Sequence, residues 1–257
     1  MPMRLKKLFQ DKMKDILNIY CTAGFPTLDS TLKVMGSLQL NGADLIEIGM
    51  PFSDPLADGP VIQNSSAVAL QNGMTIEILF EQLQNMRKKI DIPVVLMGYL
   101  NPILQFGFEN FCIHAKAVGI DGLIIPDLPD IEFERTYRAI IQQNKLEFIF
   151  LVTPETSEER IRKLDELSSG FLYAVTESGT TGSENKKLNA MNFLERLQGM
   201  NLKNPVLAGF GIHDKNSFNE VCRFTNGAII GSAYIKALKT DETIDSDTEH
   251  FLQSIVN

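Results

Sequence analysis

A glutamate inside an otherwise apolar segment is the residue whose position most clearly suggests chemistry. The segment Asp44–Gly49 reads DLIEIG, which places Glu47 just before its carboxyl end. A strand buried on both faces has no solvent to stabilise an ionised carboxylate. Such a group is either paired with a neighbour in a structural role or used for proton transfer, and the spacing leaves both interpretations open. Glu47 is therefore a candidate acid or base.

A second carboxylate follows in a loop whose path is restricted by proline. Asp58 lies in the segment Pro51–Pro60, which contains three prolines and ends in Asp58-Gly59-Pro60. Asp54 and Asp58 are also typical of turns, where an Asp side chain bonds to the backbone. A pair of carboxylates from adjacent parts of one site nevertheless suits general acid–base catalysis.

Two glycine-containing segments in the second half of the chain suggest a phosphate site. Gly209-Phe210-Gly211 ends one predicted strand, and Gly231-Ser232 ends the next, just before a helical segment. Glycines let backbone N–H groups approach an anion, and a helix N-terminus favours negative charge. The same glycines would also serve tight turns. Gly211, Gly231 and Ser232 are the candidate phosphate ligands here.

Some chemistries are disfavoured by the residues at the strand ends. No predicted strand ends in the lysine that a Schiff-base lyase needs. The three histidines, His114, His213 and His250, are scattered and more typical of surface positions, so no metal site is predicted. The three cysteines form no CxxC pair and are predicted to be reduced, packed thiols; they are Cys21, Cys112 and Cys222.

The elements that position these residues follow an alternating pattern. Eight short apolar or β-branched segments are predicted to be buried parallel strands, and helix-period segments lie between them. The strands are Ile16–Ala23, Asp44–Gly49, Pro93–Tyr99, Gly122–Asp127, Phe148–Thr153, Gly170–Thr176, Pro205–Gly211 and Gly227–Ala233.

Two helices carry specific start signals. Apolar residues from Ile76 to Ile90 follow Thr75, which is predicted to cap that helix. Thr156 and Glu159 are predicted to form a capping box at the start of a second helix, whose apolar stripe is Ile161, Leu164 and Leu167. Residues Met1–Asp15 mix lysines with Leu5, Leu8 and Phe9, which indicates an amphipathic helix rather than a signal peptide.

The length of 257 residues fits one barrel of eight strand–helix units, which typically needs about 250. We predict an α/β fold, a single TIM-barrel domain spanning residues 1–257, with an extra N-terminal helix. An open doubly wound sheet is the alternative, but its dinucleotide-binding version would carry G-x-G-x-x-G where this chain has Cys21–Pro26.

Composition limits the partners. Lys and Arg total 24 against 32 Asp and Glu, and the net charge of −8 argues against a nucleic-acid or anionic-membrane binder. No apolar run approaches the roughly 20 residues needed to cross a bilayer. We expect a cytoplasmic protein.

The segment Glu47–Pro60, EIGMPFSDPLADGP, resembles a highly specific motif of tryptophan synthase alpha chains. Four further segments resemble the other strand-end motifs of that family, in the same order, so the resemblance covers essentially the whole chain. They are Thr22–Pro26, Leu96–Pro102, Ile125–Pro129 and Gly209–Ile212.

The resemblance implies a lyase that splits indole-3-glycerol phosphate by a retro-aldol reaction into indole and glyceraldehyde 3-phosphate. It implies that Glu47 shuttles protons, that Asp58 holds the indole N–H, and that Thr181 orients Asp58. It further implies an indole pocket and a phosphate site. The pocket residues would be Tyr20, Met97, Ile124, Leu151, Tyr173 and Phe210, and the phosphate ligands Gly182, Gly211, Gly231 and Ser232.

The same resemblance implies a partner, a tryptophan synthase beta chain that carries pyridoxal phosphate and forms an α₂β₂ tetramer, whereas this chain would need no cofactor of its own. The chain departs from the family in one loop, where Glu177 and Thr180 replace the commoner residues and alter the expected contacts of loop closure. Two other functions stay open: another phosphate-binding TIM-barrel enzyme of tryptophan or histidine biosynthesis, and a non-catalytic regulatory subunit.

Overall fold

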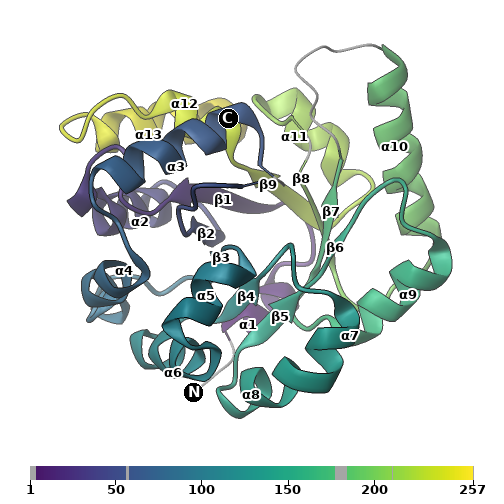
Figure 1. The fold of residues 1–257 in the computed structure, drawn as a ribbon. Helices are drawn as coiled ribbons and strands as arrows, with labels where there is room; N and C mark the ends of the chain where they lie inside the picture. The colour runs from purple at the N-terminus through teal and green to yellow at the C-terminus, as the bar shows by residue number, and fades with distance from the viewer. Residues whose placement is uncertain (1–3, 56–57, 177–183, 210, 257) are drawn as a thin grey trace.

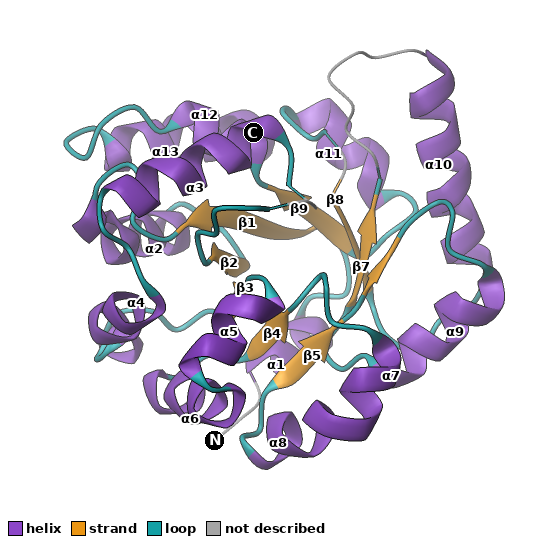
Figure 2. Ribbon diagram, in the orientation of Figure 1, coloured by secondary structure: helices purple, strands orange, loops and turns teal. Residues whose placement is uncertain are grey.

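The strands of the chain curl into a closed parallel barrel (Figures 1 and 2). The structure is a computed structural model, and it describes residues 4–55, 58–176, 184–209 and 211–256, with only the backbone described for 184–187. The strands within these residues are β1 (Ile16–Thr22), β2 (Leu45–Gly49), β3 (Val94–Met97), β4 (Gly122–Ile124), β5 (Glu147–Ile149), β6 (Leu151–Val152), β7 (Leu172–Val175), β8 (Val206–Gly209) and β9 (Gly227–Ile230).

The strand order explains how the barrel closes. Neighbouring strands run β5-β4-β3-β2-β1-β9-β8-β7-β6, and each pair is parallel. The two outermost strands, β5 and β6, are consecutive in the chain and separated only by Phe150. The covalent chain therefore joins the two edges of the sheet, and the predicted (β/α)₈ barrel is confirmed.

The prediction of one strand over Phe148–Thr153 was wrong in detail. The first half of this segment pairs with β4 and the second half with β7, and the ladder is interrupted at Phe150 between them. Staggering of strands around a closed barrel makes each one meet its two neighbours at different heights, which accounts for the split.

Helices surround the barrel (Figure 1). They are α1 (Arg4–Asp11), α2 (Thr31–Leu40), α3 (Pro60–Gln71), α4 (Ile76–Leu83), α5 (Leu100–Phe106), α6 (Phe108–Val118), α7 (Asp130–Glu132), α8 (Arg138–Gln143), α9 (Glu158–Leu167), α10 (Glu184–Gly199), α11 (Lys215–Cys222), α12 (Ser232–Ala237) and α13 (Ile244–Val256), with short 3₁₀ helices η1 (Leu28–Ser30) and η2 (Met86–Lys88) and a π-helical turn η3 (Phe133–Tyr137).

Alternate strand residues fill the inside of the barrel. Side chains two residues apart on a strand share a face, and one buried cluster takes a residue from most of the strands and one from α1. Its members are Leu5, Ile16, Leu45, Val95, Ile124, Ile149, Phe171, Leu207 and Ile229. Residues two positions further along each strand therefore also face the interior, one level closer to the carboxyl ends of the strands.

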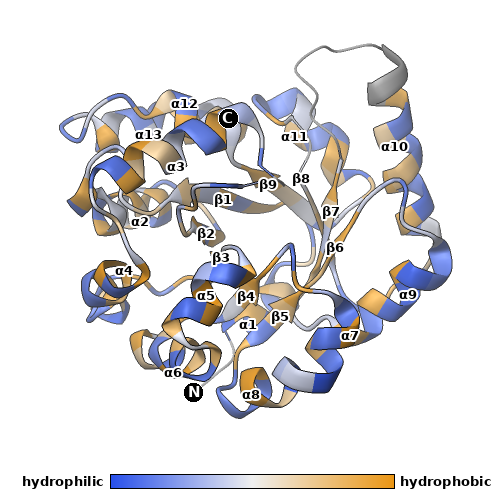
Figure 3. Ribbon diagram, viewed as in Figure 1, coloured by the Kyte–Doolittle hydropathy of each residue, from blue (hydrophilic) through white to orange (hydrophobic). Residues whose placement is uncertain are grey.

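A larger cluster lies between the outer face of the barrel and the helices. The strands and helices accordingly carry hydrophobic residues where they meet, while hydrophilic residues recur along the helices (Figure 3). Burial on both faces is what a parallel sheet requires, and it confirms that the apolar segments form buried strands.

The N-terminal helix closes the amino-terminal end of the barrel. Leu5 of α1 is fully buried in the interior cluster, and a Cβ on Gly170 would lie 2.5 Å from its Cδ2. Arg4 bonds to Asp121, which is also paired with Arg87. This confirms the predicted amphipathic N-terminal helix and leaves the carboxyl ends of the strands as the open face.

Two details of the predicted helices differ. The stripe from Ile76 is interrupted because Asn85 takes a left-handed conformation (φ 74°), so α4 ends at Leu83 and η2 follows. Thr75 does cap α4, accepting from Ile78 N–H at 3.2 Å. The predicted capping box at Thr156 was wrong: Ser157 caps α9, and Thr156 Oγ1 instead accepts from Thr153 N–H.

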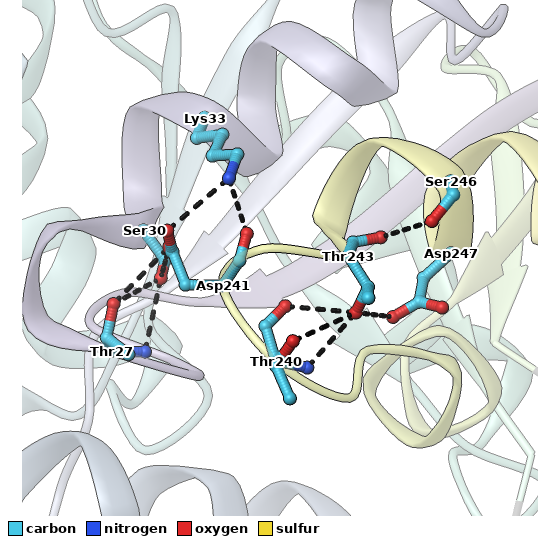
Figure 4. Close-up of polar contacts among 8 residues, drawn as sticks. All are labelled: Thr27, Ser30, Lys33, Thr240, Asp241, Thr243, Ser246 and Asp247. Carbon is cyan, nitrogen blue, oxygen red and sulfur yellow. Dashed lines mark hydrogen bonds and ion pairs between the residues drawn. The ribbon is translucent and has the colours of Figure 1, made fainter.

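A polar contact ties the first helical unit to the last. Asp241, between α12 and α13, accepts from Ser30 Oγ at 2.7 Å and from Lys33 Nζ at 3.3 Å (Figure 4). The hydrogen bond from Ser30, with the charge of Lys33, holds the pKa of Asp241 below its usual range. Within the described residues, no helix is long and apolar enough to cross a membrane.

Candidate active site

Glu47 lies inside the barrel. It follows the interior residue Leu45 by two positions on β2 and stands beside Tyr20 in the β1–β2 register. Its side chain is 0% exposed, and Asn18 Nδ2 donates to its Oε2 at 3.0 Å. Its second oxygen, Oε1, has no hydrogen-bond partner among the described residues.

Burial changes the acidity of Glu47. Loss of solvation raises its pKa from 4.5 to about 8, opposed by the hydrogen bond from Asn18 and increased by the negative charge of Asp58. At neutral pH the side chain is therefore mostly a neutral carboxylic acid that ionises within one or two pH units. A group with such a pKa can both donate and accept a proton near pH 7.

Asp58 is held at the mouth of the barrel by contacts to its loop. Gln63 of α3 donates from Nε2 to the Asp58 carbonyl at 2.8 Å and to the Pro55 carbonyl at 3.4 Å. Burial raises the pKa of the Asp58 carboxyl from 3.8 to about 6, and a hydrogen bond with the Tyr99 side chain lowers it. Asp58 is therefore mostly ionised at neutral pH, which makes it the charged member of the pair.

Two tyrosines complete this group. The pKa values of Tyr20 and Tyr173 are both raised by burial, and the charges of Glu47 and Asp58 contribute to each. Tyr20 is the register neighbour of Glu47, and the charge interactions of Tyr173 with Glu47 and Asp58 assign it to the same group, although Tyr20 and Tyr173 come from strands on different sides of β9.

Glycines leave room for the two rings. A Cβ on Gly49 would lie 1.9 Å from the Tyr20 hydroxyl oxygen, and a Cβ on Gly209 would lie 3.0 Å from the Tyr173 ring. Both glycines face the interior at the carboxyl ends of their strands, two residues after Glu47 and Leu207 respectively. The absence of a side chain there lets each phenol lie over the end of the neighbouring strand.

The other predicted pocket residues divide between two levels. Met97, Leu151 and Tyr173 are partly buried and pack on the interior cluster from the carboxyl-terminal side. Ile124 is 0% exposed and belongs to the cluster itself, so it forms the floor beneath them. These residues bring an apolar surface next to Glu47, as a pocket for an aromatic ring requires.

The predicted phosphate ligands that are described lie at the ends of β8 and β9. Gly231 precedes α12 and is half-buried, with Ser232 as the first residue of that helix. A Cβ on Gly231 would lie 3.4 Å from Tyr20 Cβ. Because Tyr20 is the register neighbour of Glu47, this end of β9 lies close to the Glu47 site. Gly211 is exposed and takes φ 37°, a left-handed conformation that favours glycine.

The remaining predictions have mixed outcomes. Thr181, Gly182 and Phe210 lie outside the described residues, as do Glu177 and Thr180. The three cysteines are free and buried, and the three histidines are exposed, as predicted. Among the described side chains, no group of three or more His, Cys, Asp or Glu is placed to hold a metal ion.

Two polar residues of the site were not singled out from the sequence. Asn18 is fully buried and bonds to Glu47, and Tyr99, at the start of α5, bonds to Asp58 and lies against Phe52 with ring centroids 5.1 Å apart. An asparagine inside an apolar strand was a visible signal for the first. Tyr99 follows a strand in the same way as Asp58 and could have been found by asking which polar residues follow each strand.

A separate surface hollow of about 360 Å³ shares no residue with this group. It lies between α10 and the segment after β6, and Phe193 and Arg196 are among its lining residues. Arg196 is engaged there by the carbonyls of Pro154 and Thr156.

Known proteins with similar sequences and structures agree on one family. The family model described as tryptophan synthase alpha chain matches residues 6–256. The tryptophan synthase alpha chain of Flavobacterium johnsoniae is 52% identical over 234 residues, covering 91% of this chain and 92% of its own. That of Bacteroides thetaiotaomicron is 49% identical over 242 residues, covering 93% and 94%.

Solved structures give the same result. The tryptophan synthase A-subunit of Pyrococcus furiosus superposes with a TM-score of 0.87 at 34% identity, covering 95% of this chain and 98% of its own. A chain of Mycobacterium tuberculosis tryptophan synthase superposes with a TM-score of 0.86 at 29% identity, covering 98% of both. The barrel with its buried Glu47 and the loop carboxylate Asp58, and these similarities over nearly the full length, lead to one conclusion: the chain belongs to the tryptophan synthase alpha chain family.

Proposed function

We propose that this chain cleaves indole-3-glycerol phosphate into indole and glyceraldehyde 3-phosphate, with Glu47 and Asp58 as its catalytic residues. Membership of the family makes it a lyase subunit of tryptophan synthase. The single observation that supports the residue assignment is the buried carboxyl of Glu47, with a pKa of about 8, interacting electrostatically with Asp58 inside the barrel.

The reaction follows from these two acidities. Glu47, protonated at neutral pH, gives its proton to indole C3, which turns the ring into an electron-accepting indolenine. The resulting carboxylate takes the proton of the glycerol 3′-hydroxyl, the bond between C3 and the glycerol carbon breaks, and its electron pair stays with the ring. Indole and the aldehyde leave, and Glu47 is protonated again. The ionised Asp58 would accept the indole N–H and stabilise the positive charge that develops on the ring.

The surrounding residues fit the two halves of the substrate. Tyr20, Met97, Leu151 and Tyr173, above Ile124, supply the apolar pocket for indole. Gly231 and Ser232 at the start of α12, together with Gly211, supply backbone N–H groups for the phosphate, at the position where barrel enzymes commonly bind it. From the family resemblance we also assign Phe210 to the indole pocket, Gly182 to the phosphate site and Thr181 to the orientation of Asp58. Because side chains carry all proton transfers, we assign no cofactor to this chain.

Removing the carboxyl groups tests the proposal. Glu47→Gln and Asp58→Asn should each lower indole release at saturating substrate by about a hundredfold or more, the usual contribution of a positioned acid or base. Glu147→Gln is a matched control, since Glu147 is a half-buried strand carboxylate at the amino end of β5. Near-normal turnover in Glu47→Gln would overturn the assignment, and an inactive wild-type protein would favour a non-catalytic subunit.

We also propose a tryptophan synthase beta chain as partner in an α₂β₂ tetramer, with pyridoxal phosphate on that chain. Leu104 of α5 and Ile131 of α7 are 45% and 58% exposed, and both helices follow strands on the face where the site opens. Large exposed apolar side chains on one face are typical of an interaction surface.

We further propose that residues 1–257 act as one domain and that the protein is cytoplasmic, where its buried free thiols would stay reduced.

A further inference from the structure

The only side-chain hydrogen bond of Asn18 within the described structure goes to the proposed catalytic carboxyl. Asn18 follows the interior residue Ile16 by two positions on β1, and its side chain is 0% exposed. Its partner in the β1–β2 register is Leu45, two residues before Glu47. Its amide thus reaches diagonally across the strands, and Nδ2 meets Glu47 Oε2 at 3.0 Å.

Packing does not explain this amide. The interior cluster around this level is wholly aliphatic or aromatic, and a buried polar group without full hydrogen bonding is unfavourable in such surroundings. Asn18 Oδ1 has no partner among the described residues, and neither does Glu47 Oε1. A leucine of similar size would fill the same space without leaving an amide oxygen unsatisfied.

We propose that Asn18 is a positioning residue that holds Oε2 of Glu47 and leaves Oε1 as the oxygen that exchanges protons with the substrate. The proposal rests on the proposed role of Glu47. An asparagine suits a group that cycles between two protonation states, because its N–H₂ can donate to Oε2 both when Glu47 is a carboxylate and when it is a carboxylic acid protonated at Oε1.

The charges around Glu47 give this contact a measurable signature. The titratable groups that interact with it are Tyr20 and Cys21 on β1, Asp58 after β2 and Tyr173 on β7. Each of these side chains is neutral when protonated and negatively charged when deprotonated, so none of them can stabilise the Glu47 carboxylate by a positive charge. The hydrogen bond from Asn18 is the interaction that lowers the Glu47 pKa, so its removal should raise that pKa.

The experiment compares Asn18→Leu and Asn18→Asp with wild type by steady-state kinetics across pH. Asn18→Leu should lower kcat by about 10- to 100-fold, the range for losing a hydrogen bond to a charged group, with a smaller change in KM. The alkaline limb of kcat/KM should move to higher pH in Asn18→Leu and further in Asn18→Asp, which adds a like charge. Thermal stability of Asn18→Leu at pH 6 should equal or exceed that of wild type.

Controls separate this inference from its alternatives. Asn144→Leu removes a buried amide that bonds only to the Ile140 carbonyl within the described structure, and it should leave the pH profile unchanged.

A purely structural Asn18 would give a less stable Asn18→Leu with a wild-type pH profile, which overturns the proposal. If Glu47→Gln abolishes turnover but neither Asn18 variant shifts the limb, only this inference fails. If Glu47→Gln stays active, the proposed function fails first. Asn18→Asp supplies the pH test if the leucine variant does not fold.

Discussion

The phenol of Tyr20 occupies the space that a side chain at position 49 would need. A Cβ on Gly49 would lie 1.9 Å from the Tyr20 hydroxyl oxygen and 2.3 Å from the ring carbon that carries it. Tyr20 is 5% exposed, and its neighbour in the register is Glu47. The absence of a side chain at Gly49 therefore determines where the Tyr20 ring can lie in the site.

Gly49→Ala should displace Tyr20 and damage the indole pocket. We expect at least a tenfold loss of kcat/KM, because an interior clash of this size forces the ring or the strand to move. Gly36→Ala is the control, since a Cβ there meets nothing within 4 Å and lies on helix α2. That variant should keep full activity and gain about 0.5–1 kcal/mol of stability. Normal kinetics in Gly49→Ala would show that Tyr20 does not shape the pocket.

The pH dependence of kcat/KM should be bell-shaped. Asp58 acts as an ion, so activity should rise as pH increases through about 6, the pKa of its carboxyl. Glu47 starts the cycle as an acid, so activity should fall as pH increases through about 8. Steady-state rates from pH 5 to 9.5 test this. A profile that is still rising at pH 9 would contradict Glu47 as the initial proton donor.

Glu47→Gln should make the protein more stable at neutral pH. The folded-state pKa of about 8 exceeds the ordinary 4.5, so the folded protein binds more protons between these values and its stability falls as pH rises through that window. At pH 7 the neutral isostere should gain on the order of 3 kcal/mol, from about 1.4 kcal/mol per pH unit above 4.5. Denaturant unfolding at pH 7 and pH 4 measures the gain, which should vanish at pH 4. If the difference in unfolding free energy between Glu47→Gln and wild type is the same at pH 7 and pH 4, Glu47 is not desolvated in the folded protein.

Gly231→Asp should weaken phosphate binding without unfolding the barrel. The carboxylate would stand at the start of α12, where the proposed phosphate lies, and repel it. Gly231→Ala separates charge from bulk, because its Cβ would make contacts of 3.4 Å to Ile62 and Tyr20. Titration with glycerol 3-phosphate should show weaker binding to the aspartate variant and a smaller change for the alanine variant. Unaltered affinity in a folded Gly231→Asp protein would refute the phosphate assignment.

Partner binding should depend on the apolar face around the site. Leu104→Gln and Ile131→Gln should weaken binding of a tryptophan synthase beta chain, and the beta chain should raise the cleavage rate of the wild-type protein. Leu40→Gln is the control, because Leu40 is 84% exposed but ends α2 on the opposite, amino-terminal side of the barrel. Calorimetric titration and indole release measure the two effects. Wild-type affinity in both face variants would place the partner elsewhere.

Local sequence determined the elements and the catalytic candidates. Apolar segments spaced by helical stripes specified eight strands, because burial on both faces demands uninterrupted apolar residues. Glu47 was visible because it breaks that pattern, and Asp58 because a proline-restricted loop follows the same strand. The glycines at the ends of β8 and β9 were visible because they follow predicted strands, and the carboxyl ends of all strands share one face of a barrel.

Tertiary structure alone decided which distant residues meet. The pairing of Asn18 with Glu47 depends on the β1–β2 register, and the approach of Tyr173 to that pair depends on closure of the ring between β5 and β6. Neither is encoded in a local period, since a one-residue shift of register would turn each side chain to the other face. The acidity of Glu47 is likewise a property of the closed barrel, because desolvation acts only once the surrounding strands have excluded water.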